Sequence, residues 1–261
     1  MKYLSLIVLL LPALAWGQRF QLAAPHLTVD SVFFRKQAQV ELAFDLDGAA
    51  IRYTTDGTYP NDTATMYKKP IVFTTSGIIR AKATHPDFLS GNAAEKNVFK
   101  INFLPDSIGL QPTPDTLYRG KGAATLFDLR KGDADLKSGR WLGFRTDTVV
   151  VETRFKNPVS LKTLQVSSLF DAGAWIFPPS RIEVYGASGK GNWQTVGVWN
   201  AREGFRWKDL PSKYDQYQKV IIRPLPVDRL QIRVVPFGRL PDGHPGAGQA
   251  AWLFIDEIIF Q

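Results

Sequence analysis

The chain has 261 residues, of which 44% are hydrophobic and 21% are charged, the composition of an ordinary globular protein of one or two domains. It contains no cysteine, which excludes disulfides, thiol chemistry and thiolate metal sites. The formal net charge is +8, but the basic residues form no dense block, so we expect no nucleic-acid partner. A mildly basic surface suits acidic polysaccharides or an anionic envelope.

The first 17 residues have the layout of a secretory signal peptide. Lys2 supplies a positive start, and the apolar run from Leu4 to Leu14 that follows is too short to span a bilayer. Small residues allow cleavage after Ala15 or after Gly17. No later segment reaches the roughly 20 consecutive apolar residues of a transmembrane helix. We therefore expect a secreted or periplasmic product without a transmembrane segment.

Short runs in which apolar and polar residues alternate recur along the rest of the chain. This period of two is typical of strands that bury one face. Asp-Gly and Ser-Gly pairs between the runs indicate turns, and no stretch has the 3.6-residue period and caps of a long helix. We therefore expect an all-β protein built from sandwiches or barrels. The clearest runs are Val40 to Phe44, Ile79 to Ala83, Arg181 to Tyr185 and Leu230 to Val234.

A boundary between two domains is predicted at residues 104–116. Pro105, Pro112 and Pro114 interrupt the alternation there, and we interpret the segment as a linker because proline is poorly tolerated inside a sheet. The composition also changes, since every tryptophan outside the signal region follows this segment. The predicted domains are residues 19–103 and 117–261.

The first domain, residues 19–103, contains a strand that enters an Asp-Gly turn, from Ile51 to Pro60. Its Tyr-Thr-Thr-Asp-Gly-x-x-Pro core resembles the C-terminal immunoglobulin-like domain of chitobiases and β-hexosaminidases. The resemblance implies a β-sandwich without catalytic function. The residues agree, because Asp56 is better placed to stabilise its turn than to act as an acid or base. The alternative role for this segment is a ligand contact through Tyr53 or Tyr59.

The second domain, residues 117–261, carries three motifs in order: Gly139 to Phe144, Pro178 to Val184, and the closing Asp256 to Ile258. Together they resemble a discoidin-like (F5/8 type C) jelly roll, in the version that follows the immunoglobulin-like domain in some glycoside hydrolases. The expected fold class is thus all-β, with an immunoglobulin-like β-sandwich followed by a discoidin-like jelly-roll β-sandwich.

This second resemblance implies a sugar site in the loops at one end of the sandwich. A pyranose packs its apolar face on an aromatic ring, while its hydroxyls require hydrogen-bond partners. The alternative for each aromatic candidate is a role in the core or in loop packing, and we assign Trp141 and Trp252 to the core because strand residues flank them. The ligand-binding candidates are Trp175, Phe177, Trp199, Arg202, Arg239 and His244.

The same resemblance implies a structural calcium ion close to the sugar-binding end. Calcium requires several oxygen ligands, normally carboxylates and backbone carbonyls. The segment from Asp128 to Asp133, together with Glu257, resembles that site, although Arg130 and Lys131 inside the segment depart from the family's pattern. The candidate ligands are Asp128, Asp133 and Glu257.

No catalytic residue is predicted. The pair Asp256 and Glu257 resembles the catalytic pair of hexosaminidases, but here it follows Trp252 to Ile255, which is the context of a strand. Glycoside hydrolysis generally uses two carboxylates across a cleft, and Ser-His-Asp and metal-hydrolase spacings are absent. We therefore expect an exported protein that binds amino-sugar polymers or oligosaccharides. The alternative is a structural or interaction module with an envelope or protein partner.

Overall fold

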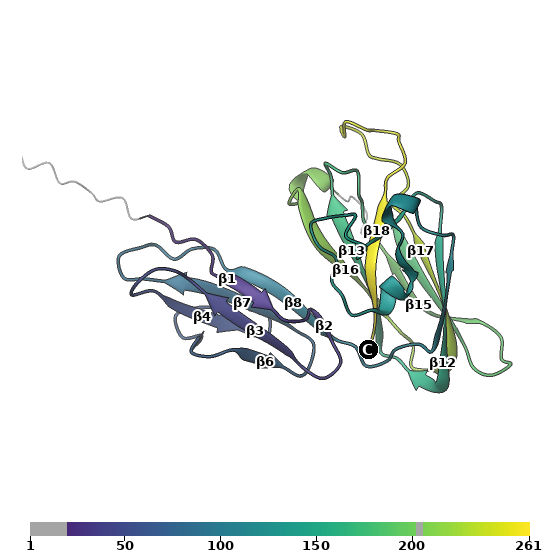
Figure 1. Ribbon diagram of the computed structural model, residues 1–261, viewed down its shortest axis with the longest axis horizontal. Coiled ribbons are helices and arrows are strands. Elements are labelled where there is room, and N and C mark those ends of the chain that lie inside the picture. Colours follow the sequence, from purple (N-terminus) through teal and green to yellow (C-terminus); the bar gives the residue numbers. More distant parts are fainter. Residues whose placement is uncertain (1–19, 202–205) are drawn as a thin grey trace, which may run out of the picture.

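The computed structural model describes residues 20–201 and 206–261 and consists almost entirely of β-strands (Figure 1). The described residues form eighteen strands and three short 3-10 helices, which confirms the predicted all-β class. The predicted signal segment, residues 1–17, and the candidate Arg202 lie outside the described residues. Within the described part of the chain, no helix is long and apolar enough to cross a membrane.

The first sandwich pairs a three-stranded sheet with a five-stranded sheet. Its core lies between them, because strand residues alternate: Ala38, Val40 and Leu42 are buried, whereas Glu41 between them is exposed. The three-stranded sheet has the order β1 (His26–Val29), β3 (Ala38–Ala43), β6 (Ile71–Phe73). The five-stranded sheet has the order β2 (Phe33–Phe34), β8 (Ala94–Lys100), β7 (Gly77–Thr84), β4 (Ala50–Thr54), β5 (Thr65–Met66).

The second sandwich pairs a four-stranded sheet with a five-stranded sheet around a larger apolar core. One sheet has the order β11 (Leu142–Phe144), β18 (Leu253–Phe260), β13 (Thr163–Asp171), β16 (Lys213–Ile221). The other has the order β15 (Gln194–Asn200), β14 (Arg181–Ala187), β17 (Pro226–Val235), β12 (Val149–Ser160), β9 (Ser107–Gln111). Short elements between β9 and β11, and before β16, are η1 (Thr116–Tyr118), β10 (Gly120–Ala123), η2 (Ala124–Phe127) and η3 (Trp207–Asp209).

The segment 104–116, predicted as a linker, belongs in large part to the second sandwich. Its residues Ser107–Gln111 form β9, which pairs antiparallel with β12 as an edge strand. The linker prediction is therefore wrong for these residues. The prolines at 105, 112 and 114 flank the strand and leave its backbone groups free to pair.

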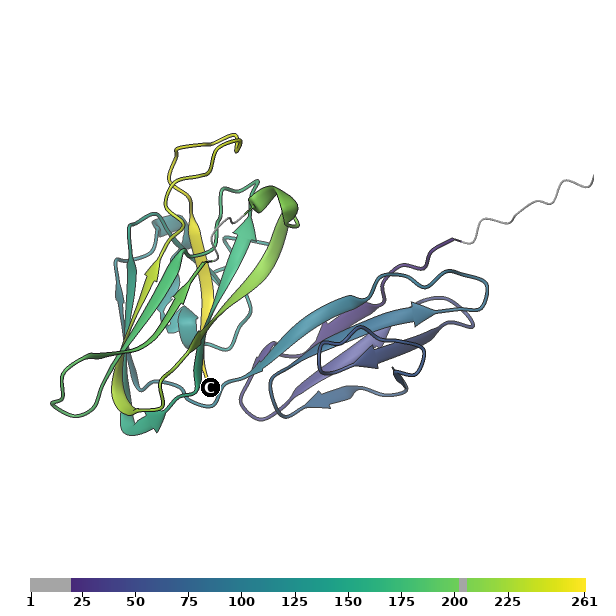
Figure 2. The ribbon, with the colours of Figure 1, turned by 180° about the vertical axis from the view of Figure 1, so that it is seen from behind.

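The two sandwiches lie side by side, with the C-terminus between them (Figures 1 and 2). The amide nitrogen of Asn102 donates to the carbonyl of Phe260 at 2.9 Å, and the side-chain amide of Gln261 donates to the carbonyl of Lys100 at 2.8 Å. Apolar residues from both sandwiches pack against one another and are buried at this junction, so the two sandwiches share an apolar interface in addition to the covalent connection. These residues are Phe33, Phe99, Ile101 and Ile259.

Candidate functional site

The loops 172–180 and 236–252 meet at one end of the second sandwich, where the sequence predicted a sugar site; the second of these loops projects at the top of Figure 1. His244 is only 6% exposed, its Nε2 atom lies 2.9 Å from the carbonyl oxygen of Ala172, and its Nδ1 atom accepts a hydrogen bond from the amide of Gly246. Phe177 is fully buried in an apolar cluster with Phe170. Both side chains pack between the loops and are buried, so in this structure neither presents a surface for a ligand at the loop end.

Trp175 and Arg239 also take part in loop packing. Trp175 is half-buried with a φ of 63°, and its ring meets that of His244 edge-on at 6.2 Å. The backbone of Gly246 passes close to this ring, because a Cβ atom there would lie 2.9 Å from Trp175 Cζ2. Arg239 is exposed and donates from Nη1 to the carbonyl of Gly248 at 2.7 Å, which closes its own loop.

Trp199 lies elsewhere, on the edge strand β15, and lines a cavity of about 390 Å³ between β15 and β16. These are the edge strands of the two opposing sheets, so the cavity opens along one side of the sandwich. Three aromatic rings, two prolines, a leucine and two side-chain amides share it. The lining residues are Pro178, Pro179, Trp199, Asn200, Ala201, Leu210, Tyr214, Gln216 and Phe237.

Polar side chains on β16 give this cavity its hydrogen-bonding capacity. Tyr214, Gln216 and Gln218 share one face of the strand, and each is linked to the next: the Gln216 amide donates to the Tyr214 hydroxyl at 2.9 Å, and the Gln218 amide donates to Gln216 Oε1 at 3.0 Å. Ser168 donates to Gln218 Oε1 at 2.9 Å. Burial raises the pKa of Tyr214 above its ordinary value of 10.0, which keeps the hydroxyl neutral.

The sequence analysis identified Trp199 as a site candidate but missed Tyr214, Gln216 and Phe237. A signal was present, because Tyr214, Gln216 and Gln218 occupy alternate positions of one strand and therefore share a face. In a sandwich, the strand face that points to the opposite sheet normally carries apolar residues. A polar set on it indicates an opening in the core.

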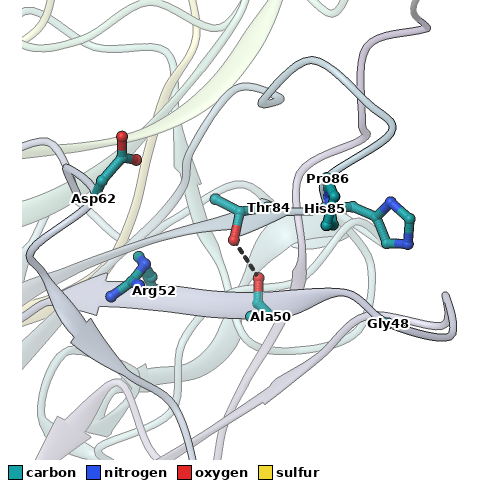
Figure 3. Close-up of a pocket in the computed structure, with 7 residues that line it drawn as sticks. All are labelled: Gly48, Ala50, Arg52, Asp62, Thr84, His85 and Pro86. Atoms are coloured by element: carbon teal, nitrogen blue, oxygen red, sulfur yellow. Dashed lines mark hydrogen bonds between the residues drawn. The ribbon is translucent and has the colours of Figure 1, made fainter.

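A second cavity, of about 400 Å³, lies on the first sandwich (Figure 3). Arg52 and Asp62 lie at one side of it and His85 at the other, and Thr84 donates to the carbonyl of Ala50 at 3.2 Å. It is an open hollow, and among the described residues that line it the imidazole of His85 is the one aromatic ring. It therefore offers charge and hydrogen bonds without the aromatic walls of the cavity between β15 and β16.

The three calcium candidates do not assemble into one ligand set. Asp133 Oδ2 lies 3.6 Å from a guanidinium nitrogen of Arg140, and Asp128 Oδ2 lies 3.2 Å from the ammonium of Lys121. Glu257 is fully buried and accepts one hydrogen bond from the backbone. In residues 20–201 and 206–261, no group of three or more His, Cys, Asp or Glu side chains is placed to hold a metal ion. The residues present therefore do not fit a bound calcium ion.

The side chains of Asp256 and Glu257 are inaccessible to a substrate, because both are fully buried. Desolvation, followed by the charges of Asp256 and Asp128, raises the pKa of Glu257 to about 10. Its Oε2 accepts a hydrogen bond from the amide of Leu129 at 3.1 Å, whereas Oε1 has no hydrogen-bond partner in the described part of the chain. A buried neutral carboxyl inside β18 is a structural group, as its strand context predicted.

Comparison with known proteins matches the family model of the chitobiase/beta-hexosaminidase C-terminal domain to residues 30–93. No curated protein matches the chain. Among solved structures, a chitosan-binding module of a chitosanase/glucanase from Paenibacillus sp. IK-5 is 9% identical with a TM-score of 0.37, over 60% of this chain and 96% of that one.

Two further solved structures are similar to the same extent. The C-terminal domain of a chitobiase from Bacteroides fragilis is 15% identical with a TM-score of 0.35, over 60% of this chain and 91% of that one. CpGH89CBM32-5 from Clostridium perfringens, solved in complex with GalNAc-beta-1,3-galactose, is 7% identical with a TM-score of 0.39, over 59% of this chain and 93% of that one. The family match confirms the resemblance inferred from Ile51 to Pro60, because residues 30–93 of the first sandwich are similar to the chitobiase/beta-hexosaminidase C-terminal domain.

Proposed function

We propose that this chain is a non-catalytic carbohydrate-binding protein whose sugar site is the cavity between β15 and β16. The observation that carries the proposal is the meeting of three aromatic rings, Trp199, Tyr214 and Phe237, in one cavity with the amides of Asn200 and Gln216. Aromatic rings cover the apolar face of a pyranose, and amides both donate to and accept from its hydroxyls. A concave, mostly apolar site with a few polar groups is the usual form of a small-ligand site.

Amino sugars are the proposed ligand class. An N-acetyl group presents a methyl and an amide together, and the cavity offers apolar walls at Pro178, Pro179 and Leu210 beside the amide of Gln216. The match of residues 30–93 to the C-terminal domain of chitobiase and β-hexosaminidase supports the same class, because those names describe enzymes that act on amino-sugar glycans.

Binding without hydrolysis is supported by the distribution of carboxylates. Hydrolysis of a glycosidic bond generally uses two carboxyl groups across a sugar-binding cleft. Among the described residues that line the proposed site, none carries a carboxylate. Asp256 and Glu257, the one adjacent Asp-Glu pair in the chain, are fully buried in β18.

A second candidate function is a structural or protein-interaction module. The observation that favours it is the burial of Phe177 and His244, which leaves the predicted loop end without those two groups for a sugar. In that case the apolar side chains exposed on the edge strands would contact an envelope or protein partner. These are Val198 on β15, 42% exposed, and Ile221 on β16, 68% exposed.

Export is part of the proposal and is supported by the sequence of residues 1–17, with Lys2 before the run Leu4 to Leu14. The test is expression of the full chain followed by fractionation and N-terminal sequencing of the product. A new N-terminus after Ala15 or Gly17 in the periplasm or the medium is expected. An intact Met1 in the cytoplasm would remove this part of the proposal.

Binding is tested by calorimetric titration with N-acetylglucosamine oligomers and a glycan panel, using wild type, Trp199→Ala and a matched control. Trp193→Ala is the control, because Trp193 is a tryptophan at the start of the same segment of chain, 43% exposed, and lies outside the cavity. We expect Trp199→Ala to weaken binding tenfold or more, about 1.4 kcal/mol, and Trp193→Ala to leave it unchanged. No binding by folded wild type, or equal binding by both variants, contradicts the proposal.

A further inference from the structure

Lys131 sits at the centre of a nearly buried ionic cluster in the second sandwich. Its ammonium lies 2.7 Å from Asp256 Oδ2 and 3.0 Å from Asp215 Oδ1. Its side chain is 14% exposed, and that of Asp256 is not exposed at all. One cation therefore joins three segments: the loop between η2 and β11, the edge strand β16 and the interior strand β18.

The loop around Lys131 is fitted closely to this cluster. The amide of Gly132 donates to Asp256 Oδ2 at 2.7 Å, so the carboxylate is bound by both the backbone and the ammonium. The Trp141 ring covers the ammonium, with its centroid 4.4 Å from Nζ. A cation over an aromatic face is attracted by the ring's electron density, and more strongly when it is desolvated.

The neighbouring carboxylates have cationic partners of their own. Asp128 pairs with Lys121 at 3.2 Å, and Asp133 lies 3.6 Å from Arg140. A calcium ion requires six to eight oxygen ligands, and an ammonium supplies none. A divalent ion bound at Asp256 would also be repelled by Lys131, whose charge lies within hydrogen-bond distance of that carboxylate.

We propose that the Lys131 ammonium is the internal cation of this sandwich: it fixes the loop 128–133 to β16 and β18 in the way that the discoidin-like resemblance assigns to a calcium ion. The residues disagree with that resemblance because the candidate segment 128–133 carries its own positive charge, the Lys131 ammonium, which binds Asp256 and Asp215. The fold of the second sandwich is therefore independent of calcium.

The cluster also has a consequence for the junction of the two sandwiches. Lys131 and Asp215 line a cavity of about 380 Å³ together with Glu95, Lys96 and Asn97 of the first sandwich. The ammonium thus fixes one wall of a space that both sandwiches enclose. According to this proposal, the wall does not depend on calcium.

The test is the melting temperature of the mature chain in calcium chloride and in EDTA, together with calorimetric titration of the protein with calcium chloride alone. Wild type is expected to melt within about 1 °C in the two solutions and to show no calcium-binding heat. A higher melting temperature in calcium, a lower one in EDTA, or saturable calcium binding overturns the proposal. This arm uses only wild type and does not depend on whether a variant folds.

A second arm uses two Lys→Met variants that differ in the surroundings of the ammonium. Lys131→Met leaves the Asp256 carboxylate buried without its cation, and we expect the melting temperature to fall by about 10 °C. Lys121→Met removes the ammonium of a side chain that is 54% exposed, and we expect its melting temperature to fall by less than about 2 °C. Equal shifts in the two variants overturn the proposal.

A third arm asks whether an ammonium alone restores the structure. Lys131→Ala opens a space the size of propylammonium, and we expect propylammonium to raise the melting temperature of this variant and not that of Lys121→Ala. Recovery with calcium in place of propylammonium would contradict the assignment, because it would show that the site prefers a divalent ion.

Discussion

The ring of Phe99 in the first sandwich lies 4.4 Å from the ring of Tyr217 in the second, at an interplanar angle of 49°. Phe99 belongs to β8 and Tyr217 to β16, so the contact joins sheets of different domains. The ring of Phe33 also stacks against that of Phe99, with the ring centroids 6.1 Å apart. An aromatic contact of this kind, with the apolar cluster around it, sets how the two sandwiches lie against each other.

Removal of the Tyr217 ring should uncouple the two sandwiches. Tyr217→Ala loses the contact with Phe99, worth about 1 kcal/mol beyond the area it buries, while the core of each sandwich is retained. We expect two separate unfolding transitions in calorimetry and a larger radius of gyration in solution scattering. Tyr217→Phe is the control and should behave as wild type. A single unchanged transition in Tyr217→Ala would show that other contacts hold the junction.

Gly132 is a position where a single added carbon should destabilise the second sandwich. A Cβ atom there would lie 2.1 Å from Trp141 Cε2, and Trp141 is 1% exposed and has no room to move. Gly132→Ala should cost about 2 kcal/mol or more in urea unfolding. Gly109→Ala in β9, where the nearest atom is 3.6 Å away, should stay within about 0.5 kcal/mol of wild type. Equal costs in the two variants would contradict the packing described for the loop.

The strands were predictable where the period of two is strong. The runs Ile79 to Ala83, Arg181 to Tyr185 and Leu230 to Val234 lie within β7, β14 and β17, and Val40 to Phe44 overlaps β3 except for Phe44, because alternation of burial is a direct product of strand geometry. β9 was not predictable in the same way. It is a short edge strand between prolines, and its pairing partner β12 lies some 40 residues further along the chain.

The site was predictable only in part. Trp199 does line a cavity, but the burial of His244 depends on a hydrogen bond to Ala172, 72 residues away, which no local pattern reveals. Lys131 was noted only as a departure from a family pattern. Its role follows from the placement of Asp215 and Asp256, which depends on the order of strands in the sheet.

Glu257 should make the protein less stable as the pH rises. Its pKa is about 10 in the folded chain and near 4.5 when the chain is unfolded, so the contribution of the buried neutral carboxyl is fully present below about pH 4.5. Above that pH the unfolded chain releases the proton and the folded chain retains it. Stability then falls by up to about 1.4 kcal/mol per pH unit until the folded group titrates.

Urea unfolding of wild type and Glu257→Gln at pH 5 and pH 9 measures this contribution. Gln retains an acceptor for the amide of Leu129 and has no proton to lose, so the variant should lose less stability between the two pH values than wild type. Glu152→Gln, at an exposed position on β12, is the control and should follow wild type. Equal pH dependence in wild type and Glu257→Gln would show that this carboxyl is already ionised in the folded protein.

Substitution of Phe177 should mainly reduce stability, whereas substitution of Trp199 should mainly reduce sugar binding. Phe177 is fully buried, and Phe177→Ala is expected to cost about 3–5 kcal/mol in urea unfolding, since it leaves a cavity among the loop aromatics. At a temperature where this variant is folded, its affinity for an N-acetylglucosamine oligomer should stay within a few-fold of wild type. Trp199→Ala should show the reverse, a small change in stability and a large loss of affinity, because its half-buried ring lines the cavity. If folded Phe177→Ala loses binding while Trp199→Ala retains it, the sugar site lies at the loop end and not between β15 and β16.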